Sequence, residues 1–370
     1  MKYYIIAGEA SGDLHAANLI QALKQQDAEA DICAWGGDLM EEQGAILVKH
    51  YRDLAFMGFL EVVLNIGTIF TNIRFCKKDI QEWNPDVLIL VDYPGFNLRM
   101  AEFAHQNGIK VIYYISPKVW AWKKSRVYKI KKFVDKMLVI FPFEKAFYAQ
   151  YNYPVEFVGN PILDALPKEP IDKQIFRTEN KLSDKPIIAL LPGSRKQEIE
   201  KMLAVMLELV DQFPDYQFVI AGAKSLNNSL YQKIIGDKEV AFVKDKTHAL
   251  LMASEAALVT SGTATLETAL LRVPEVVCYK GNAISYQIAK RIVDVKFISL
   301  VNLIMDKEIV KELIQYDLTI DNLAGELRKI LHDSKYRSAM LNNYEQLINR
   351  LGSGGASTEA ANQVIQLLKH

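Results

Sequence analysis

The first half of the chain alternates between short apolar runs and segments with helical periodicity. The apolar runs, rich in β-branched and aromatic residues, fall at residues 3–7, 31–34, 87–91, 110–115, 137–140 and 155–158. Between several of them, as at residues 14–24 and 98–107, apolar residues recur at the spacing of one helix face. Strands that alternate with helices form right-handed βαβ units, so this half predicts an α/β domain with a parallel sheet.

A change of composition separates this half from a second alternating half. Residues 166–170 read Leu-Pro-Lys-Glu-Pro, which is typical of an interdomain linker. Apolar runs then resume at residues 187–191, 217–221, 240–243, 256–259 and 276–279. We therefore predict two doubly wound, Rossmann-like domains, at residues 1–165 and 166–345. Ligands of such sheets bind beyond the carboxyl ends of the strands, so both domains are expected to face a shared cleft with their active loops.

The tail is helical from about residue 320 and contains one glycine-rich break. Residues 352–357 read Gly-Ser-Gly-Gly-Ala-Ser and precede a last helix near 358–368. A loop of this kind can cradle a phosphate, but we interpret it as a helix stop followed by a flexible joint. Residues 346–370 are therefore treated as a third segment.

Composition and charge narrow the classes of function. Basic and acidic residues balance at 44 each, which argues against binding of nucleic acid through net charge. Cys33, Cys76 and Cys278 are scattered without CxxC pairing, so a reducing cytoplasm fits better than a disulfide framework or a zinc site. The apolar run at 3–7 is too short for a signal peptide. We expect a cytoplasmic protein that binds no nucleic acid.

One strand–turn–helix unit of the second half is suited to an anion. The run at 187–191 leads through Pro-Gly-Ser-Arg into a helix predicted over 196–210. Gly193 and Ser194 let backbone N–H groups approach a ligand at a helix start, and Arg195 offers a planar fork for phosphate oxygens. The alternative is an ordinary βα turn with a surface arginine.

A second unit of this kind covers residues 259–267. Ser261, Gly262 and Thr263 offer N–H groups and hydroxyls to a phosphate, and Glu267, one helical turn later, could accept both hydroxyls of a ribose. With Arg195 they predict a nucleotide-diphosphate site. Because no Asp-x-Asp follows a strand and no histidines cluster, we expect helix dipoles and Arg195 to stabilise a leaving diphosphate without a metal or other cofactor.

The first βα loop of the chain reads Gly-Glu-Ala-Ser-Gly-Asp over residues 8–13. It can approach a ligand closely, which makes Glu9, Ser11 and Gly12 candidates for contact with an acceptor. The loop is not GxGxxG, and GxxxxGK[ST] is absent, so neither a dinucleotide fold nor a P-loop ATPase is indicated. Asp13 could equally cap the following helix.

Asp92 directly follows the buried run at 87–91, on a Tyr-Pro-Gly loop. Partial burial there would raise the pKa of the carboxyl group toward that of a useful general base, so we predict Asp92 as the catalytic base. An Asx-turn that closes the loop is the structural alternative. His15, early in a helix, is the competing base.

Two further stretches suit an anionic and apolar substrate. Residues 116–132 hold the acceptor-side candidates Ser116 and Trp120, together with Lys118, Lys123, Lys124, Arg126, Lys129, Lys131 and Lys132. This run could hold an anionic substrate or lie on anionic lipid, and the alternative is a solvated helix face.

The other stretch runs from 54 to 73, where Glu61 is the only charged residue. Its polar residues make it a weak bilayer-spanning segment, so we predict an interfacial or acyl-chain surface, with a helix buried inside the domain as the alternative. The candidate residues are Phe56, Met57, Phe59, Leu60 and Val63.

Five motifs, in this order, carry a resemblance to a known family: GEASGD (8–13), VWAW (119–122), FPFEKAFY (141–148), LLPGSR (190–195) and SGTATLE (261–267). Over nearly its whole length the sequence resembles the lipid-A-disaccharide synthases. The resemblance implies a GT-B glycosyltransferase of Gram-negative bacteria, peripheral on the inner membrane, with C-terminal helices that cross back to the first domain. It further implies transfer from UDP-2,3-diacylglucosamine to 2,3-diacylglucosamine 1-phosphate, which yields a β-1,6-linked disaccharide and UDP.

The resemblance also assigns individual positions. Asp92 matches the family's essential aspartate, and Arg195, Glu267 and Asn302 match donor-site positions. Tyr279, at the end of an apolar run, completes the donor-side candidates.

Two positions depart from the family pattern. Many relatives carry a second aspartate where this chain has Gly95, and a histidine where it has Asn160, so we expect neither a two-carboxylate mechanism nor a base at residue 160. The rival functions are another UDP-sugar enzyme, such as an N-acetylglucosaminyltransferase or an epimerase, and a non-catalytic protein that binds nucleotide sugars or lipids. A homodimer is left open.

Overall fold

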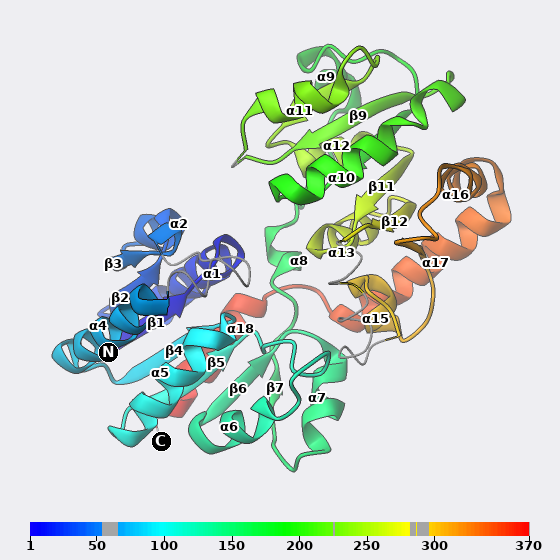
Figure 1. Cartoon of the computed structure of the whole chain (residues 1–370). Coiled ribbons are helices and arrows are strands. Elements are labelled where there is room, and N and C mark those ends of the chain that lie inside the picture. Colours follow the sequence, from blue (N-terminus) through cyan, green and yellow to red (C-terminus); the bar gives the residue numbers. More distant parts are fainter. Residues whose placement is uncertain (54–65, 225, 282–285, 287–295, 370) are drawn as a thin grey trace. The chain divides into compact units, whose positions relative to one another are not determined.

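The computed structural model (Figure 1) describes residues 1–53, 66–224, 226–281, 286 and 296–369. The chain divides into two compact units. Unit 1 consists of Met1–Asp164 and Leu351–His370, and unit 2 of Ala165–Arg350. The divisions after residues 164 and 350 lie close to the predicted ones after 165 and 345.

Unit 1 is built on a seven-stranded parallel sheet with the order β3-β2-β1-β4-β5-β6-β7. The strand order runs outward from the β1–β4 pair in both directions, so the topological switch point of a doubly wound fold lies at this pair. The strands are β1 (Lys2–Ala7), β2 (Asp31–Gly36), β3 (Ile46–His50), β4 (Val87–Val91), β5 (Lys110–Tyr114), β6 (Lys136–Val139) and β7 (Glu156–Phe157).

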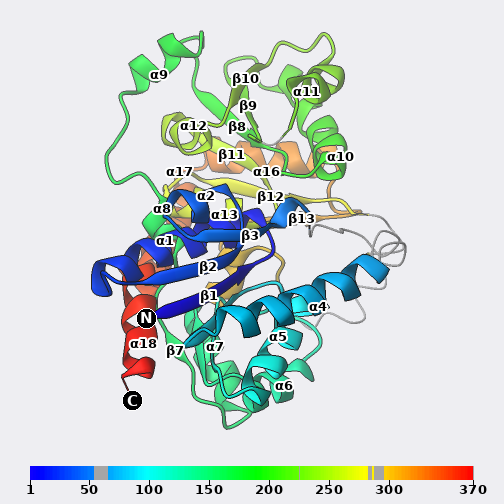
Figure 2. The same cartoon turned by 90° about the vertical axis from the view of Figure 1, so that its left-hand side faces the viewer.

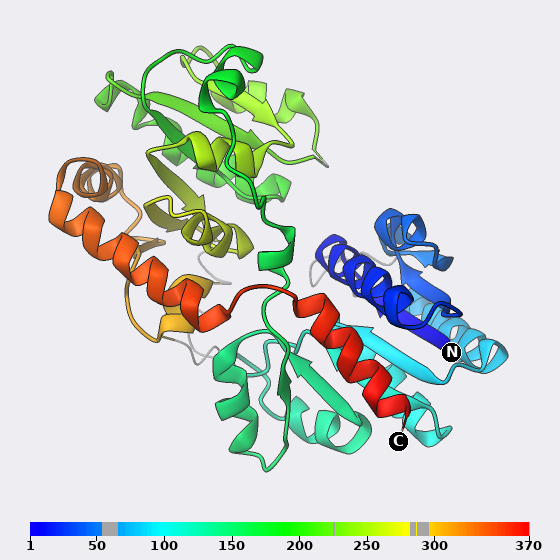
Figure 3. The same cartoon turned by 180° about the vertical axis from the view of Figure 1, so that it is seen from behind.

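Helices cover both faces of this sheet (Figure 2). The helices of unit 1 are α1 (Ala10–Gln26), α2 (Asp38–Glu42), the 3₁₀ turn η1 (Tyr51–Asp53), α4 (Ile66–Trp83), α5 (Pro94–Gln106), α6 (Arg126–Phe133), α7 (Pro142–Ala149), α8 (Ile162–Ala165) and α18 (Ala356–Leu368). Because side chains alternate across a strand, Tyr4 and Leu88 point to one face, where they join a core with Cys76 of α4, Met100 of α5 and Ile130 of α6. On the other face α1 packs on the sheet and α18 lies beside α1 (Figure 3).

The start of α18 is held by an internal carboxylate. Asp164 accepts hydrogen bonds from the backbone N–H groups of Gly355 (2.6 Å) and Ser357 (3.2 Å). Gly352, Gly354 and Gly355 have φ near +80° to +90°, which glycine adopts without strain. The glycine-rich segment is therefore a helix stop, as interpreted from the sequence, and its N–H donors already have an anionic partner.

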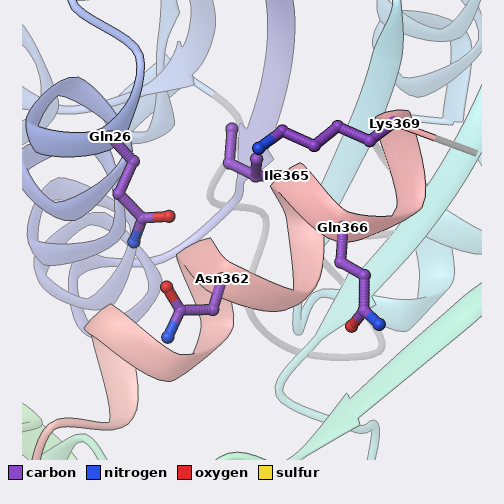
Figure 4. Close-up of a pocket in the computed structure, with 5 residues that line it drawn as sticks. All are labelled: Gln26, Asn362, Ile365, Gln366 and Lys369. Atoms are coloured by element: carbon purple, nitrogen blue, oxygen red, sulfur yellow. The ribbon is translucent and has the colours of Figure 1, made fainter.

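A shallow hollow of about 280 Å³ lies where α18 packs beside the end of α1 (Figure 4). Figure 4 shows Gln26 on α1 and the other lining residues on α18. The lining consists of Gln26, Asn362, Ile365, Gln366 and Lys369. It contains none of the predicted site residues.

Unit 2 repeats the plan with a six-stranded parallel sheet of order β10-β9-β8-β11-β12-β13. Its strands are β8 (Ile187–Leu191), β9 (Gln217–Gly222), β10 (Ala241–Lys244), β11 (Ala256–Thr260), β12 (Glu275–Tyr279) and β13 (Lys311–Ile314). Its helices are α9 (Lys173–Glu179), α10 (Lys196–Leu207), the 3₁₀ turn η2 (Val210–Gln212), α11 (Asn228–Ile235), α12 (Thr247–Ala253), α13 (Thr263–Leu270), α15 (Leu300–Met305), α16 (Ile320–His332) and α17 (Ser334–Leu351). The fully buried strands β8 and β11 pair at its centre.

Candidate functional site

Asp92 lies at the carboxyl end of β4, beside the switch point of unit 1. Its backbone is left-handed, with φ of 45°, and so is that of Tyr93, with φ of 48°. The Pro94–Gly95 segment, expected as a loop, is in fact the first turn of α5, because proline fixes a helical φ and is favoured there. The chain therefore turns directly from strand to helix at Asp92 and Tyr93.

This unusual backbone is held by side chains from two elements. Asn97 of α5 is fully buried, and its amide donates to the carbonyl oxygens of Asp92 (2.8 Å) and Val91 (3.2 Å). The Tyr113 hydroxyl of β5 donates to the same Asp92 carbonyl (2.5 Å). Left-handed non-glycine residues persist where the surroundings over-determine them, and they concentrate at functional sites.

The Asp92 carboxyl group has a pKa raised from 3.8 to about 6. Burial is the largest cause and the negative charge of Glu9 adds to it, while the positive charge of Lys118 and the N–H of Tyr93 oppose it. The pKa of Asp92 therefore depends on charges from two other predicted site segments, the first βα loop and the basic run. A half-buried carboxylate with a pKa near 6 can accept a proton at neutral pH.

The first βα loop is shorter than expected, because α1 begins at Ala10 and places Ser11 and Gly12 in its first turn. Glu9 and Ser11 are exposed, whereas Gly12 is buried against Ala7, where an added Cβ would come within 3.3 Å of the alanine side chain. Gly8 is required because the ring of Tyr93 covers it, and an added Cβ would lie 2.4 Å from that ring.

Asp13 is structural, but it caps a helix other than the one expected. Its carboxylate accepts hydrogen bonds from the N–H groups of Gly37 (2.8 Å) and Met40 (3.2 Å), which begin α2, and not from the helix that contains it. Burial raises the pKa of the Asp13 carboxyl group against these bonds.

The basic run divides into a buried part and an exposed part. Ser116 and Trp120, predicted to contact an acceptor, are buried: the Ser116 hydroxyl lies 2.7 Å from that of Tyr148, and the Trp120 ring packs edge-on against Phe143 at 5.1 Å. Ile115, directly before Ser116, has φ of +64°, a rare conformation for a β-branched residue. In this structure Ser116 and Trp120 therefore act as anchors of the loop.

The exposed part of the run carries cations and one large ring. The Trp122 side chain is 41% exposed, with Lys123 Nζ 4.4 Å and the Arg126 guanidinium carbon 5.5 Å from its ring. Lys118 is exposed as well. Outward-facing charge and aromatic surface of this kind fit an anionic amphiphile.

Glu144 lies beneath this loop and was not singled out from the sequence. It is 1% exposed and accepts the N–H groups of Ile140 (3.2 Å) and Phe141 (3.0 Å) at the start of α7. Burial raises the pKa of its carboxyl group to about 8, although these two bonds and the side chains of Ser116 and Trp120 favour the ionised form. The loop anchors thus meet at a carboxyl group that is largely protonated at neutral pH.

In unit 2, the turn after β8 is capped from within. Glu198, the third residue of α10, accepts the N–H groups of Ser194 (3.3 Å) and Arg195 (3.4 Å) and pairs with the Arg195 guanidinium at 3.0 Å. Gly193 has φ of +110°, and an added Cβ there would lie 2.7 Å from a Glu198 oxygen. The anion position predicted for a phosphate therefore holds an internal carboxylate, and Glu198 is a residue that sequence reasoning missed.

The turn after β11 leaves Gly262 and Thr263 exposed at the start of α13. The Ser261 hydroxyl, in contrast, donates to the carbonyl of Ile298 at 3.0 Å. Glu267, predicted to bind a ribose, lies 2.9 Å from Nε2 of His248 on α12. His248 also escaped the sequence analysis.

Asn302 and Tyr279 differ sharply in exposure. The Asn302 amide is fully buried, where its nitrogen donates to Val310 O and Glu312 Oε1 and its oxygen accepts from the N–H groups of Ile309 and Val310. All four hydrogen-bonding positions of the amide are used, so the expected side-chain contact with a donor is replaced here by an internal role. Tyr279, at the carboxyl end of β12, is 36% exposed.

The acyl-chain candidates Phe56, Met57, Phe59, Leu60 and Val63 lie outside the described residues. Helix α4, which follows them, carries the exposed ring of Phe70 (56%) and the partly exposed ring of Phe75 (44%), which packs against Trp35 at 5.7 Å. Among the helices that the structure describes, none is both long enough and apolar enough to cross a bilayer. In the same part of the chain, no three or more His, Cys, Asp or Glu side chains gather in a group that could hold a metal ion.

Comparison with known proteins identifies the family. A family model for lipid-A-disaccharide synthetase matches residues 3–365. The lipid-A-disaccharide synthase of Trichlorobacter lovleyi is 38% identical over 371 residues, which cover 99% of this chain and 97% of the relative. The chain belongs to the lipid-A-disaccharide synthase family. The synthase of Coxiella burnetii (37% identical, 98% of each chain) agrees with this, so the protein is a disaccharide-forming glycosyltransferase.

Solved structures with a similar fold are more distant in sequence. UDP-GlcNAc 2-epimerase from Neisseria meningitidis, bound to UDP-GlcNAc, aligns over 100% of both chains with a TM-score of 0.70 at 16% identity. The glycosyltransferase of kitacinnamycin aligns over 99% of both chains, with a TM-score of 0.65 at 13% identity. These likenesses show the fold, two Rossmann-like α/β domains. The epimerase alternative is not favoured, because the relatives close in sequence are lipid-A-disaccharide synthases.

Proposed function

We propose that this family member transfers the sugar of UDP-2,3-diacylglucosamine to the 6-hydroxyl of 2,3-diacylglucosamine 1-phosphate. The products are the β-1,6-linked disaccharide 1-phosphate and UDP. The family assignment supports the reaction, and the carboxyl group of Asp92, with its pKa near 6 at the switch point of unit 1, is the observation that carries the mechanism.

The proposed chemistry is an inverting displacement without a metal. Asp92 takes the proton of the acceptor's 6-hydroxyl while that oxygen attacks the anomeric carbon of the donor. The bond from that carbon to the diphosphate oxygen breaks, and the electron pair leaves with UDP. Arg195 and the N–H groups at the start of α13, where Gly262 and Thr263 are exposed, stabilise the departing diphosphate, which requires the ligand to replace Glu198 as the partner of Arg195.

We also propose that unit 1 binds the acceptor and works at the inner-membrane surface. Lys118 and the cations around Trp122 offer positive charge to the acceptor phosphate. Exposed Phe70 lies on the same face of α4 as the exposed Arg74 and Lys78, four and eight residues later, which gives this helix an apolar and cationic outer face. Sedimentation with anionic vesicles checks this part, since Phe70→Ser should reduce the bound fraction and an unchanged fraction would contradict it.

The reaction itself is tested by UDP release from UDP-2,3-diacylglucosamine in detergent plus EDTA. Release that requires 2,3-diacylglucosamine 1-phosphate and persists in EDTA is the expected result. Release without acceptor would indicate hydrolysis or another sugar-nucleotide reaction, and loss in EDTA would contradict metal independence. UDP binding without any turnover would favour a non-catalytic binding protein.

A further inference from the structure

The carboxylate of Glu267 is held by a histidine from a different helix. Nε2 of His248 on α12 lies 2.9 Å from Oε2 of Glu267 on α13, and the two residues are 19 positions apart in the chain. Because a carboxylate only accepts hydrogen bonds, the histidine donates through Nε2. The pair therefore depends on the packing of two helices and not on helical i, i+4 spacing.

Both side chains remain accessible to a ligand. His248 is 31% and Glu267 is 23% exposed, and Glu267 lies one helical turn after the exposed Thr263. A fully exposed pair would add little, since two mobile side chains in water interact weakly. Here partial burial restricts both side chains beside the loop assigned to the nucleotide diphosphate.

Recognition of a ribose by this carboxylate depends on its orientation. Each carboxylate oxygen can accept two hydrogen bonds, so the histidine bond to Oε2 leaves Oε1 and one further position on Oε2 for hydroxyl groups. A carboxylate fixed in advance by a neighbour loses less rotamer freedom when a ligand binds. The hydrogen bond from His248 therefore favours binding of the two ribose hydroxyl groups by the Glu267 carboxylate.

We propose that His248 is a positioning residue that sets the discrimination of this enzyme between ribose and 2′-deoxyribose nucleotides, through its hydrogen bond to Glu267. The proposal rests on the proposed donor site in unit 2. It adds a determinant of donor specificity that neither contacts the reacting atoms nor shares a motif with Glu267.

The test compares the affinities of full-length variants for UDP and 2′-deoxy-UDP by calorimetric titration. His248→Phe keeps a ring but removes the N–H donor, and His248→Gln restores a donor on a side chain of similar reach. His50→Gln is the matched control, because His50 forms a comparable pair with Asp38 (3.2 Å) in unit 1. Thermal unfolding without ligand reports on folding.

We expect the wild-type protein to prefer UDP over 2′-deoxy-UDP by about tenfold, the scale of one hydrogen bond to a charged group. His248→Phe should reduce this preference to about threefold or less, chiefly by lowering the affinity for UDP. His248→Gln and His50→Gln should keep the wild-type preference. If His248 had a purely structural role, its substitution would lower the affinities for UDP and 2′-deoxy-UDP equally and leave their ratio unchanged.

Glu267→Gln separates failure of the proposal from failure of the donor site. If Glu267→Gln abolishes the preference while His248→Phe retains it, the role of His248 is wrong and the donor site stands. If neither substitution changes the ratio of the two affinities, Glu267 does not bind the ribose hydroxyls. The assignment of Glu267 to the donor site then fails together with the proposal.

Discussion

The two units share a doubly wound topology, but the candidate site residues at the carboxyl ends of their strands lie in different environments. Left-handed residues directly follow strands in both units, Asp92 and Ile115 in unit 1 and Asp245 and Gln315 in unit 2. In unit 1, the Asp92 carboxyl group has a pKa raised to about 6. In unit 2, the groups expected to bind a ligand already have partners, Glu198 on Arg195 and His248 on Glu267. In the proposed mechanism, unit 1 therefore supplies the base at a constrained turn, whereas unit 2 supplies binding groups kept in place by internal partners.

This difference fits the separate demands of chemistry and binding. A general base works best when burial makes its charge less favourable, which costs stability in the folded state. A diphosphate site needs donors that keep their geometry without ligand, and an internal carboxylate can hold them until the ligand arrives. A parallel sheet of the same kind can serve both demands because the candidate residues lie in the turns and first helical turns after its strands, where the sequence can vary without changing the sheet.

The largest expected effect is that of Asp92→Asn. Loss of the general base should lower kcat by about 10²–10⁴-fold, measured as acceptor-dependent UDP release. Because the folded-state pKa of Asp92 is raised, its charge disfavours folding above about pH 6, so the variant should unfold at the same or a higher temperature at pH 7.5. Asp86→Asn, just before the other end of β4, is the control, and near-normal turnover of Asp92→Asn would remove the base assignment.

The second effect belongs to unit 2. Arg195→Ala should lower kcat/KM for the donor by about ten- to a hundredfold, since it removes a charge-assisted bond to the diphosphate. Lys196→Ala is the adjacent control, because Lys196 pairs only loosely with Glu200 (3.9 Å) on the solvent side. Equal rates for the two variants would exclude Arg195 from the site.

A third test uses the pH dependence of the wild-type rate. A base with a pKa near 6 is mostly protonated at pH 5, so kcat/KM there should be roughly tenfold below its plateau above pH 7. Glu9→Gln removes a negative charge that raises this pKa, and it should shift the acidic limb to lower pH. A value of kcat/KM that stays constant down to pH 5 would contradict a catalytic carboxylate with a pKa near 6.

The smallest effect concerns stability beneath the basic loop. Glu144 has a folded-state pKa of about 8 against an ordinary value of 4.5, so between these values the folded protein binds more protons than the unfolded chain. Its contribution to stability is complete below about pH 4.5 and is lost as pH rises through 8. Chemical denaturation at several pH values should show that Glu144→Gln gains stability relative to wild type as pH rises, and parallel curves would contradict this.

Much of the fold follows from apolar runs in the sequence. The central strands β4 and β8 have the predicted bounds, because they are buried on both faces and read as continuous apolar stretches. Strands β3 and β13 were not predicted. They lie at sheet edges, are largely half-buried and include charged residues such as Lys49 and Glu312. No apolar run marks β13, whereas the short run Ala-Ile-Leu-Val at residues 45–48 could have indicated β3.

Less of the candidate site than of the fold could be predicted from the sequence. Asp92 follows a readable strand, whereas its raised pKa depends first on burial, and then on the charge of Glu9, which raises it, against that of Lys118, which lowers it. Only the tertiary structure sets these three influences. Glu198 could have been found, since an acidic residue three positions after a helix start is a local capping pattern. His248 could not, because no local spacing links it to Glu267.

The C-terminal helix α18 also constrains how the chain can fold during synthesis. Its partner α1 precedes all of unit 2 in the chain, and the Asp164 carboxylate that fixes the start of α18 is made nearly two hundred residues before Gly355. Unit 2, in contrast, is contiguous from Ala165 to Arg350. A ribosome can therefore release a complete unit 2 while unit 1 still lacks α18 beside α1, so chaperones have more reason to hold unit 1 than unit 2.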